Sequence, residues 1–91
     1  MPVKPGIKAK ILKSGIYQSI LGFFLENEGS VDTPRGIATW IGEGLIKVRV
    51  ALEELAEMNC LKAHRTSSTI GYSCMLSVKE LGSLVLKSKT P

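Results

Sequence analysis

Hydrophobic positions in the first two thirds of the chain recur every three or four residues, which is the spacing of one face of an α-helix. The helices that this spacing predicts cover residues 16–28, 34–41 and 44–59. In the longest of them, Val48, Leu52 and Leu55 fall on one side, which indicates a buried face. We therefore expect three helices around one small core.

After the third helix the spacing of apolar residues falls to two, which is typical of strands with one buried face. We expect strands over residues 60–66 and 71–77, joined by a turn at SSTI, and a last helix that starts near Val78. Lys87 and Lys89 suit the end of that helix, because cations interact favourably with its free carbonyl groups.

Residues with strong positional preferences mark the ends of these helices. Thr33 is a good N-cap and Pro34 fits the first helical turn, while Gly42 suits the end of the second helix. Ser77 and Glu80 have the spacing of a capping box. These signals support the boundaries drawn from the hydrophobic pattern.

The N-terminal segment, residues 1–13, differs from the rest of the chain in charge. Its basic residues are Lys4, Lys8, Lys10 and Lys13. It has no acidic residue, whereas residues 14–91 carry eight basic and eight acidic side chains, so the net charge of +4 belongs to this segment. We expect a basic arm over 1–13, followed by one domain over 14–91. The arm either adds affinity for nucleic acid by counterion release or only aids solubility, and a short helix from Pro5 is the alternative to a loose arm.

The sequence has no apolar run of about 18 residues, so no transmembrane helix is expected. The basic N-terminal segment lacks the continuous apolar stretch and the cleavage site of a signal peptide. We therefore expect a cytoplasmic protein with no membrane partner.

No sequence motif for catalysis or metal binding is present. The chain contains no Gly-rich phosphate loop, HExxH, GxSxG or CxxC sequence. We therefore expect no enzyme activity, no cofactor and no metal site. Cys60 and Cys74 are either reduced, partly buried thiols or a single disulfide, since the expected hairpin brings them near each other.

The order helix, helix, helix, hairpin, helix resembles the winged helix-turn-helix family, and so does the segment IATWIGEGLIKVRVALEELAEMNCLKA. The residues that stand at the positions of the family's core pattern are Ile37, Ala38, Gly42, Val48, Ala51, Leu52, Leu55 and Leu61. Asn59 replaces the usual glycine and tolerates the same left-handed backbone. The closing LSVKELGSLVL is similar to the segment after the wing in regulators of the MarR and ArsR kind.

This resemblance implies a mainly α fold with a small β-hairpin, made of a three-helix core, a wing and a C-terminal helix. It also implies a transcriptional regulator that binds double-stranded DNA, with the helix at 44–59 in the major groove. The residues that we expect to contact DNA are Arg35, Thr39, Ile46, Lys47, Arg49, Val50, Lys62, His64 and Arg65. Regulators of this family often begin the recognition helix with Ser or Thr, whereas this chain has Gly44-Leu45-Ile46 there.

At 100° per residue, with Val48 toward the core, Ile46 and Val50 point outward and Lys47 and Arg49 flank them on opposite sides. In the DNA hypothesis the cations contact phosphates or guanine edges, and the aliphatic pair meets thymine methyl groups. Two alternatives remain open. The helix face is simply solvated, with intrahelical pairs such as Arg49–Glu53, or the aliphatic pair is a protein contact, which would make the chain a protein–protein interaction module.

Surplus apolar residues at two helices predict a homodimer. Tyr17, Leu21 and Leu25 make the stripe of the first helix broader than one small core needs. The last helix carries Leu84, Val85 and Leu86 around much of its surface. Left uncovered, these residues would form an exposed patch, so we expect a second copy to cover them.

Overall fold

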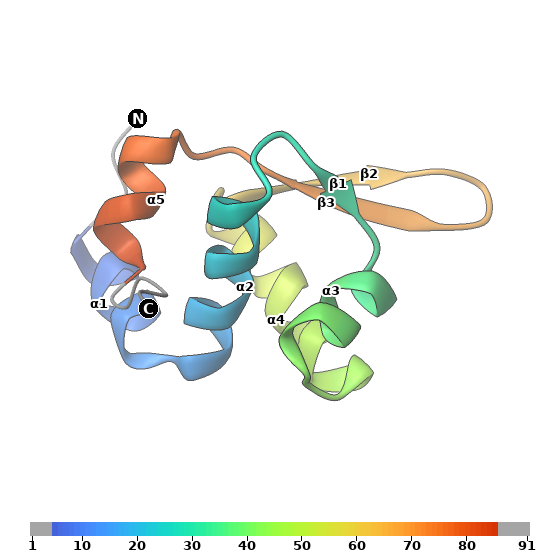
Figure 1. Cartoon of the computed structure of the whole chain (residues 1–91), viewed down its shortest axis with the longest axis horizontal. Helices are drawn as coiled ribbons and strands as arrows, with labels where there is room; N and C mark the ends of the chain where they lie inside the picture. Colours follow the sequence, from blue (N-terminus) through green and yellow to red (C-terminus); the bar gives the residue numbers. More distant parts are fainter. Residues whose placement is uncertain (1–4, 86–91) are drawn as a thin grey trace.

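The computed structural model describes residues 5–85 as five α-helices and one three-stranded antiparallel sheet (Figure 1). The helices are α1 (Pro5–Lys13), α2 (Gly15–Glu26), α3 (Pro34–Ile41), α4 (Leu45–Glu57) and α5 (Val78–Leu84). The strands are β1 (Val31–Asp32), β2 (Leu61–Arg65) and β3 (Ile70–Cys74). The expectations that concern Lys4, Leu86, Lys87 and Lys89 lie outside the described residues. Within residues 5–85, no helix has the length and apolar character that crossing a bilayer requires.

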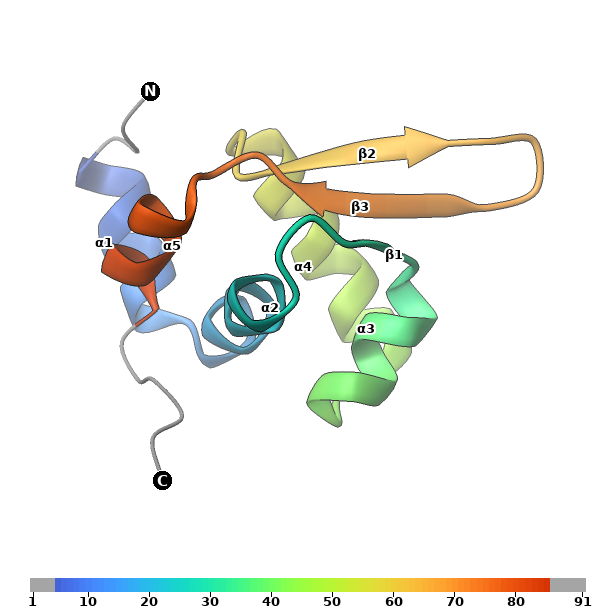
Figure 2. The ribbon, with the colours of Figure 1, turned by 45° about the horizontal axis from the view of Figure 1, so that its top comes forward.

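Helix α2 occupies the centre of the molecule. Helices α1 and α5 pack on one side of it and α3 and α4 on the other, while the β2–β3 hairpin projects away from the helices (Figures 1 and 2). The core side chains that are at most 1 % exposed include Ile20, Phe24, Ile37, Leu52 and Leu55. They come from α2, α3 and α4, so the apolar faces of the three predicted helices meet in one core.

Helix α3 has the ends that the sequence predicts. The Thr33 hydroxyl accepts a hydrogen bond from the Gly36 backbone N at 3.1 Å, Pro34 opens the first turn, and Gly42 ends the helix with a left-handed φ of 75°. A Cβ at position 36 would lie 2.5 Å from Asp32 Oδ1, so a larger residue at this corner between β1 and α3 would have to displace the Asp32 carboxylate.

The structure confirms two further predictions, at the end of α4 and at the start of α5. Asn59 has a left-handed φ of 64° after the last turn of α4, where the chain changes direction into β2. At the start of α5, the Glu80 backbone N donates to the Ser77 hydroxyl at 3.1 Å, and the Ser77 backbone N donates to Glu80 Oε1 at 2.9 Å. The bond from the Ser77 backbone N, with a second from the Ser77 hydroxyl, lowers the pKa of the Glu80 carboxyl, because both stabilise its charged form.

The sheet has β3 in the middle, with β1 and β2 on either side. Strand β2 pairs with β3 along its whole length, whereas β1 pairs only with Ser73 and Tyr72. The hairpin is therefore three-stranded at its base and two-stranded from Gly71 outward. Strand β1 was not predicted, because two residues are too short to show a periodic pattern.

Helix α1 belongs to the folded body, which corrects the expected loose arm over 1–13 for its residues 5–13. Ile11 is fully buried, and α1 packs against both α2 and α5. The Gln18 side-chain amide of α2 donates to the Ile11 carbonyl at 3.2 Å and to the Leu84 carbonyl at 2.7 Å. One side chain of α2 therefore links the ends of α1 and α5, and the helical alternative is the one that the structure adopts.

The same packing removes the sequence argument for an exposed apolar patch. Tyr17 is 6 % exposed, Leu21 is fully buried and Leu84 is 1 % exposed. The neighbours of α2 within this chain bury Tyr17 and Leu21, while Leu25 and Val85 are partly buried against the same core. These residues therefore give no support to the expected homodimer, which must rest on another observation.

We predict that replacing Ile11 with Ala lowers the free energy of unfolding by about 2–4 kcal/mol, because it leaves a cavity between α1 and the core. Chemical denaturation followed by circular dichroism measures the change. The matched control is Lys10→Ala, an exposed neighbour on the same helix, which should change stability by less than about 0.5 kcal/mol. An Ile11→Ala protein as stable as the parent would contradict the packing of α1.

Candidate nucleic-acid interface

Helices α3 and α4 are joined by a tight turn at residues 42–44. The backbone N–H groups of Gly42 and Glu43 both donate to the Ala38 carbonyl, at 2.9 and 3.1 Å, which fixes the end of α3. Gly44 is the N-cap of α4 and supplies no side-chain hydrogen bond to the new helix. The first-turn N–H groups of α4 are thus left without a side-chain partner at the tip of a helix-turn-helix unit.

One side of α4 is buried and the other is open to solvent. Val48, Leu52 and Leu55 are completely buried against the core. On the opposite side, Ile46 is 76 % exposed and Val50 is 51 % exposed. The orientation expected from helical spacing is therefore the orientation found, and an aliphatic pair faces outward from the first two turns.

One flank of α4 faces the sheet and brings together two of the predicted contact residues. Burial raises the pKa of Tyr72 and Glu53 adds to the rise, while Arg65 and Arg49 oppose it. Arg49 of α4 and Arg65 of β2 are therefore both close enough to Tyr72 to act on its hydroxyl. Both guanidinium-bearing residues are exposed, so a helix cation and a hairpin cation share one side of the molecule.

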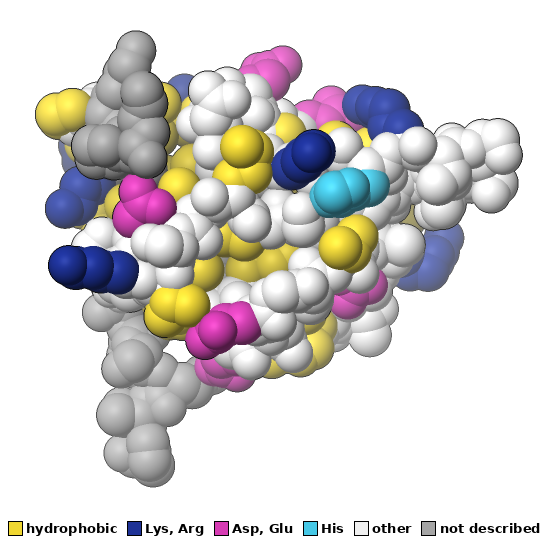
Figure 3. All heavy atoms as spheres, turned by 90° about the horizontal axis from the view of Figure 1, so that it is seen from above, with side chains coloured by type: hydrophobic (Ala, Val, Ile, Leu, Met, Phe, Trp, Pro, Cys, Tyr) yellow, Lys and Arg dark blue, Asp and Glu magenta, His cyan; other side chains and the backbone are white. Residues whose placement is uncertain are grey.

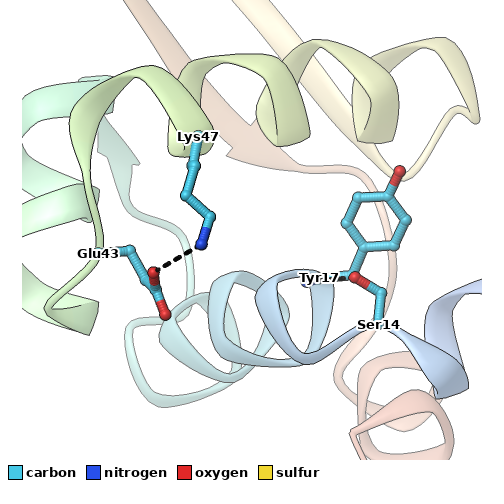
Figure 4. Close-up of polar contacts among 4 residues, drawn as sticks. All are labelled: Ser14, Tyr17, Glu43 and Lys47. Atoms are coloured by element: carbon cyan, nitrogen blue, oxygen red, sulfur yellow. Dashed lines mark hydrogen bonds and ion pairs between the residues drawn. The ribbon is translucent and has the colours of Figure 1, made fainter.

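The other flank of α4 faces α2. Lys47 Nζ lies 3.6 Å from Glu43 Oε1, with 71 % and 38 % of the two side chains exposed. Figure 4 shows Lys47 extending from α4 toward Glu43. Because an exposed pair of this kind contributes at most about 1 kcal/mol, Lys47 can exchange Glu43 for another anion at little cost. On this part of α4 the pair that forms is Lys47–Glu43, not the Arg49–Glu53 pair suggested by spacing.

Lys62 and His64 lie on the side of the hairpin away from α4. Their cross-strand partners are Ser73 and Gly71, whereas Arg65 pairs with Ile70 on the other face. His64 Nε2 and Ser73 Oγ form a hydrogen bond of 2.7 Å on this outer face. Figure 3 shows the outer face, where basic, acidic and hydrophobic side chains are interspersed and the coloured atoms form no continuous basic band. Of the three predicted wing contacts, only Arg65 lies on the α4 side.

The remaining predicted residues lie on α3. Arg35 and Thr39 are exposed and one helical turn apart, and the Thr39 hydroxyl donates to the Arg35 carbonyl at 2.9 Å. Trp40 packs its ring edge-to-face on Phe23, with centroids 5.2 Å apart, yet remains 49 % exposed. Helix α3 therefore presents one polar turn and one half-covered aromatic ring to solvent.

The two cysteines are free thiols, Cys60 buried and Cys74 partly buried. Burial raises the pKa of both thiols, which keeps them protonated and unreactive at neutral pH. Among residues 5–85, no three His, Cys, Asp or Glu side chains are grouped as metal ligands would be.

Known structures share this arrangement. No family model and no curated protein matches the sequence. The homodimeric winged helix-turn-helix DNA-binding domain of a possible ArsR-family transcriptional regulator from Mycobacterium bovis matches with a TM-score of 0.68. It is 20 % identical, and the match covers 89 % of this chain and 71 % of that one. The AntR antimony-specific transcriptional repressor matches with a TM-score of 0.69 and 21 % identity, over 92 % of this chain and 78 % of its own.

This chain has the winged helix-turn-helix fold. Helices α3 and α4 form the helix-turn-helix, α4 stands at the position of the recognition helix in that fold, and β2 with β3 forms the wing. The expected architecture, a three-helix core with a wing and a C-terminal helix, is confirmed.

One contact that orients α4 was not predicted from the sequence. The Tyr17 hydroxyl of α2 donates to Glu54 Oε1 of α4 at 2.5 Å, and Figure 4 shows the Tyr17 ring rising from α2, with its backbone N–H bonded to the Ser14 hydroxyl at 3.2 Å. Tyr17 was assigned to an apolar stripe. Its partner lies 37 residues away, and no local pattern connects the two.

Burial raises the pKa of Tyr17 to about 12 from the ordinary value of 10, and the bond to Glu54 adds to the rise. The phenol is harder to ionise in the folded chain than in the unfolded one. Its contribution to stability is therefore complete below pH 10 and lost as pH rises toward 12.

We predict that the free energy of unfolding falls more steeply between pH 10 and 12 for the parent than for Tyr17→Phe. The variant should also be about 1 kcal/mol less stable at pH 8, because the hydrogen bond is lost. Urea denaturation at each pH measures both effects. The variant keeps Tyr72, whose pKa is also raised, so equal slopes in the two proteins would contradict a role for Tyr17.

Proposed function

We propose that this chain is a DNA-binding transcriptional regulator. It acts in the cytoplasm, without catalysis, by placing the first half of α4 in the major groove and the wing beside the neighbouring backbone. A helix of this kind fits the major groove, and cations on either side of it meet the phosphates. The target is double-stranded DNA, and the chain acts as a homodimer on two half-sites.

The observation that carries this proposal is the position of Arg49 and Arg65. They come from α4 and from the wing, and both are exposed. Arg65 lies on the same face of β2 as the buried Leu61, the strand packs against α4, and both arginines oppose the rise of the Tyr72 pKa. A duplex lying along α4 would meet both guanidinium groups. Arginine suits this position because its planar group binds phosphate or guanine with two parallel hydrogen bonds.

The structural neighbours support the same function. One is described as a DNA-binding domain and the other as a transcriptional repressor. The domain from Mycobacterium bovis is described as homodimeric, which supports a dimer here. Two-fold symmetry would place two recognition helices about one turn of DNA apart.

A protein–protein interaction module is the second candidate. The exposure of Ile46 and Val50 favours it, because exposed aliphatic pairs also occur at protein contacts. The body of the chain is also neutral beyond residue 13, which gives no long-range attraction for DNA. Binding measurements with DNA separate the two candidates.

We predict that Arg49→Ala and Arg65→Ala each weaken binding to DNA selected from a random-sequence library. Each should also reduce the slope of log affinity against log salt by about 0.9 where the lost contact is to a phosphate. Fluorescence anisotropy at several salt concentrations measures both quantities. Lys62→Ala, on the outer side of the wing, is the matched control and should have the smaller effect.

Glu43→Gln should strengthen binding, since it removes a negative charge near the phosphates and frees Lys47 from its ion pair. Affinities of the two arginine variants that equal the parent's at every salt concentration would count against the proposed interface.

We predict that light scattering at micromolar concentrations gives twice the chain mass. The homodimer should persist without DNA, because the two half-sites need a fixed separation. The Ile46→Ala variant, changed on the recognition helix, serves as a control and should have the same mass. A clean monomer at high protein concentration would contradict the homodimer without affecting the assignment of α4.

A further inference from the structure

We propose that Ile46 and Val50 read the 5-methyl groups of two thymines in the major groove. This inference rests on the proposed DNA-binding function and names the feature of the DNA that α4 recognises. The half-site would then carry thymines under the first two turns of the helix, and their methyl groups would supply sequence specificity.

The geometry of the pair fits two separate bases. Ile46 and Val50 are one helical turn apart, which is about 6 Å along the axis. Successive base pairs are about 3.4 Å apart, so the two side chains would meet bases about two steps apart. Both are highly exposed, at 76 % and 51 %, and reach outward beyond the buried face of the helix.

Between the flanking Lys47 and Arg49, the outward side chains of these two turns are aliphatic and offer a base no hydrogen bond. Gly44 has no side chain, Leu45 is partly buried, and the two outward residues are aliphatic. In the major groove, the thymine methyl is the apolar group that such side chains recognise. An aliphatic pair here can therefore distinguish thymine from the other bases without any hydrogen bond.

Charge complementarity identifies DNA as the occupant of this face. By helical spacing, Lys47, which is ion-paired with Glu43, lies on one flank of the aliphatic pair and Arg49 on the other. The major groove has the complementary arrangement, because base edges lie between two phosphate backbones. Farther along the outward side come Glu53 and Glu57, so the apolar contact is confined to the first half of α4.

Because basic and acidic residues balance around α4 and the wing, we expect the contact with thymine methyl groups to supply much of the sequence specificity. Between residues 31 and 74, five side chains are basic and five are acidic. Attraction to phosphates is therefore limited for this body, and phosphate contacts carry no direct sequence information. Thymine methyl groups supply a contact that is both apolar and sequence-dependent.

The test removes single methyl groups from the DNA. A half-site is first selected from a random library with the full chain, and each thymine is then replaced in turn by deoxyuridine, which keeps the base pair and lacks the methyl. We expect about four-fold weaker binding at two positions about two steps apart, as expected for exposing one methyl-sized group. Fluorescence anisotropy measures each affinity.

Protein variants assign each methyl to its side chain. In Ile46→Ala, the effect of deoxyuridine should vanish at one of the two positions, and in Val50→Ala at the other. Val31→Ala is the matched control, because Val31 is also aliphatic and 58 % exposed but lies on β1. It should keep both deoxyuridine effects. Circular dichroism checks that each variant keeps the helical fold.

The possible results separate this inference from the proposed function. DNA binding that is insensitive to every deoxyuridine substitution would overturn the methyl contact and leave the regulator proposal in place. Deoxyuridine effects that persist unchanged in both alanine variants would overturn the assignment to these side chains. An absence of any DNA binding would overturn both proposals.

Discussion

The complete burial of Val48, Leu52 and Leu55 fixes the rotation of α4, and every functional position on that helix depends on it. With this side inward, the aliphatic pair faces solvent and the two cations fall on opposite flanks. The bond from Tyr17 to Glu54 adds a polar link to α2 on one flank only. A rotation of the helix by one residue would bury a charged side chain. The free energy needed to bury an unpaired charge is much larger than the effect of solvent or salt on an exposed pair.

Much of the fold was predictable because local signals and packing agree. Helix α3 has its predicted ends, since Thr33, Pro34 and Gly42 each satisfy a backbone requirement on their own. Helix α1 was left open between two alternatives, because Ile11 is buried by packing of α1 against α2 and the distant α5, which its local sequence does not show. Strand β1 depends on its pairing with β3 and leaves no trace in the spacing of apolar residues.

The sequence predicted which side chains of the candidate site face outward, but not which of them lie near one another. Helical spacing placed Ile46 and Val50 outward, and the structure agrees, although their contact with DNA stays a prediction. The placement of Arg49 and Arg65 where both act on Tyr72 depends on how the wing packs beside α4, which no local pattern encodes. Lys62 was grouped with Arg65 by proximity in sequence, whereas strand alternation puts the two on opposite faces.

The change from three strands to two along the wing has a mechanical consequence. At its base, β3 is held on both edges, but beyond Tyr72 the ribbon is supported by a single neighbour. Two-stranded ribbons are only marginally stable in water and bend at low cost. The outer wing can therefore bend while its base stays fixed to the helices. In the proposed complex with DNA, this bending would let the wing adjust to a groove whose width varies from site to site.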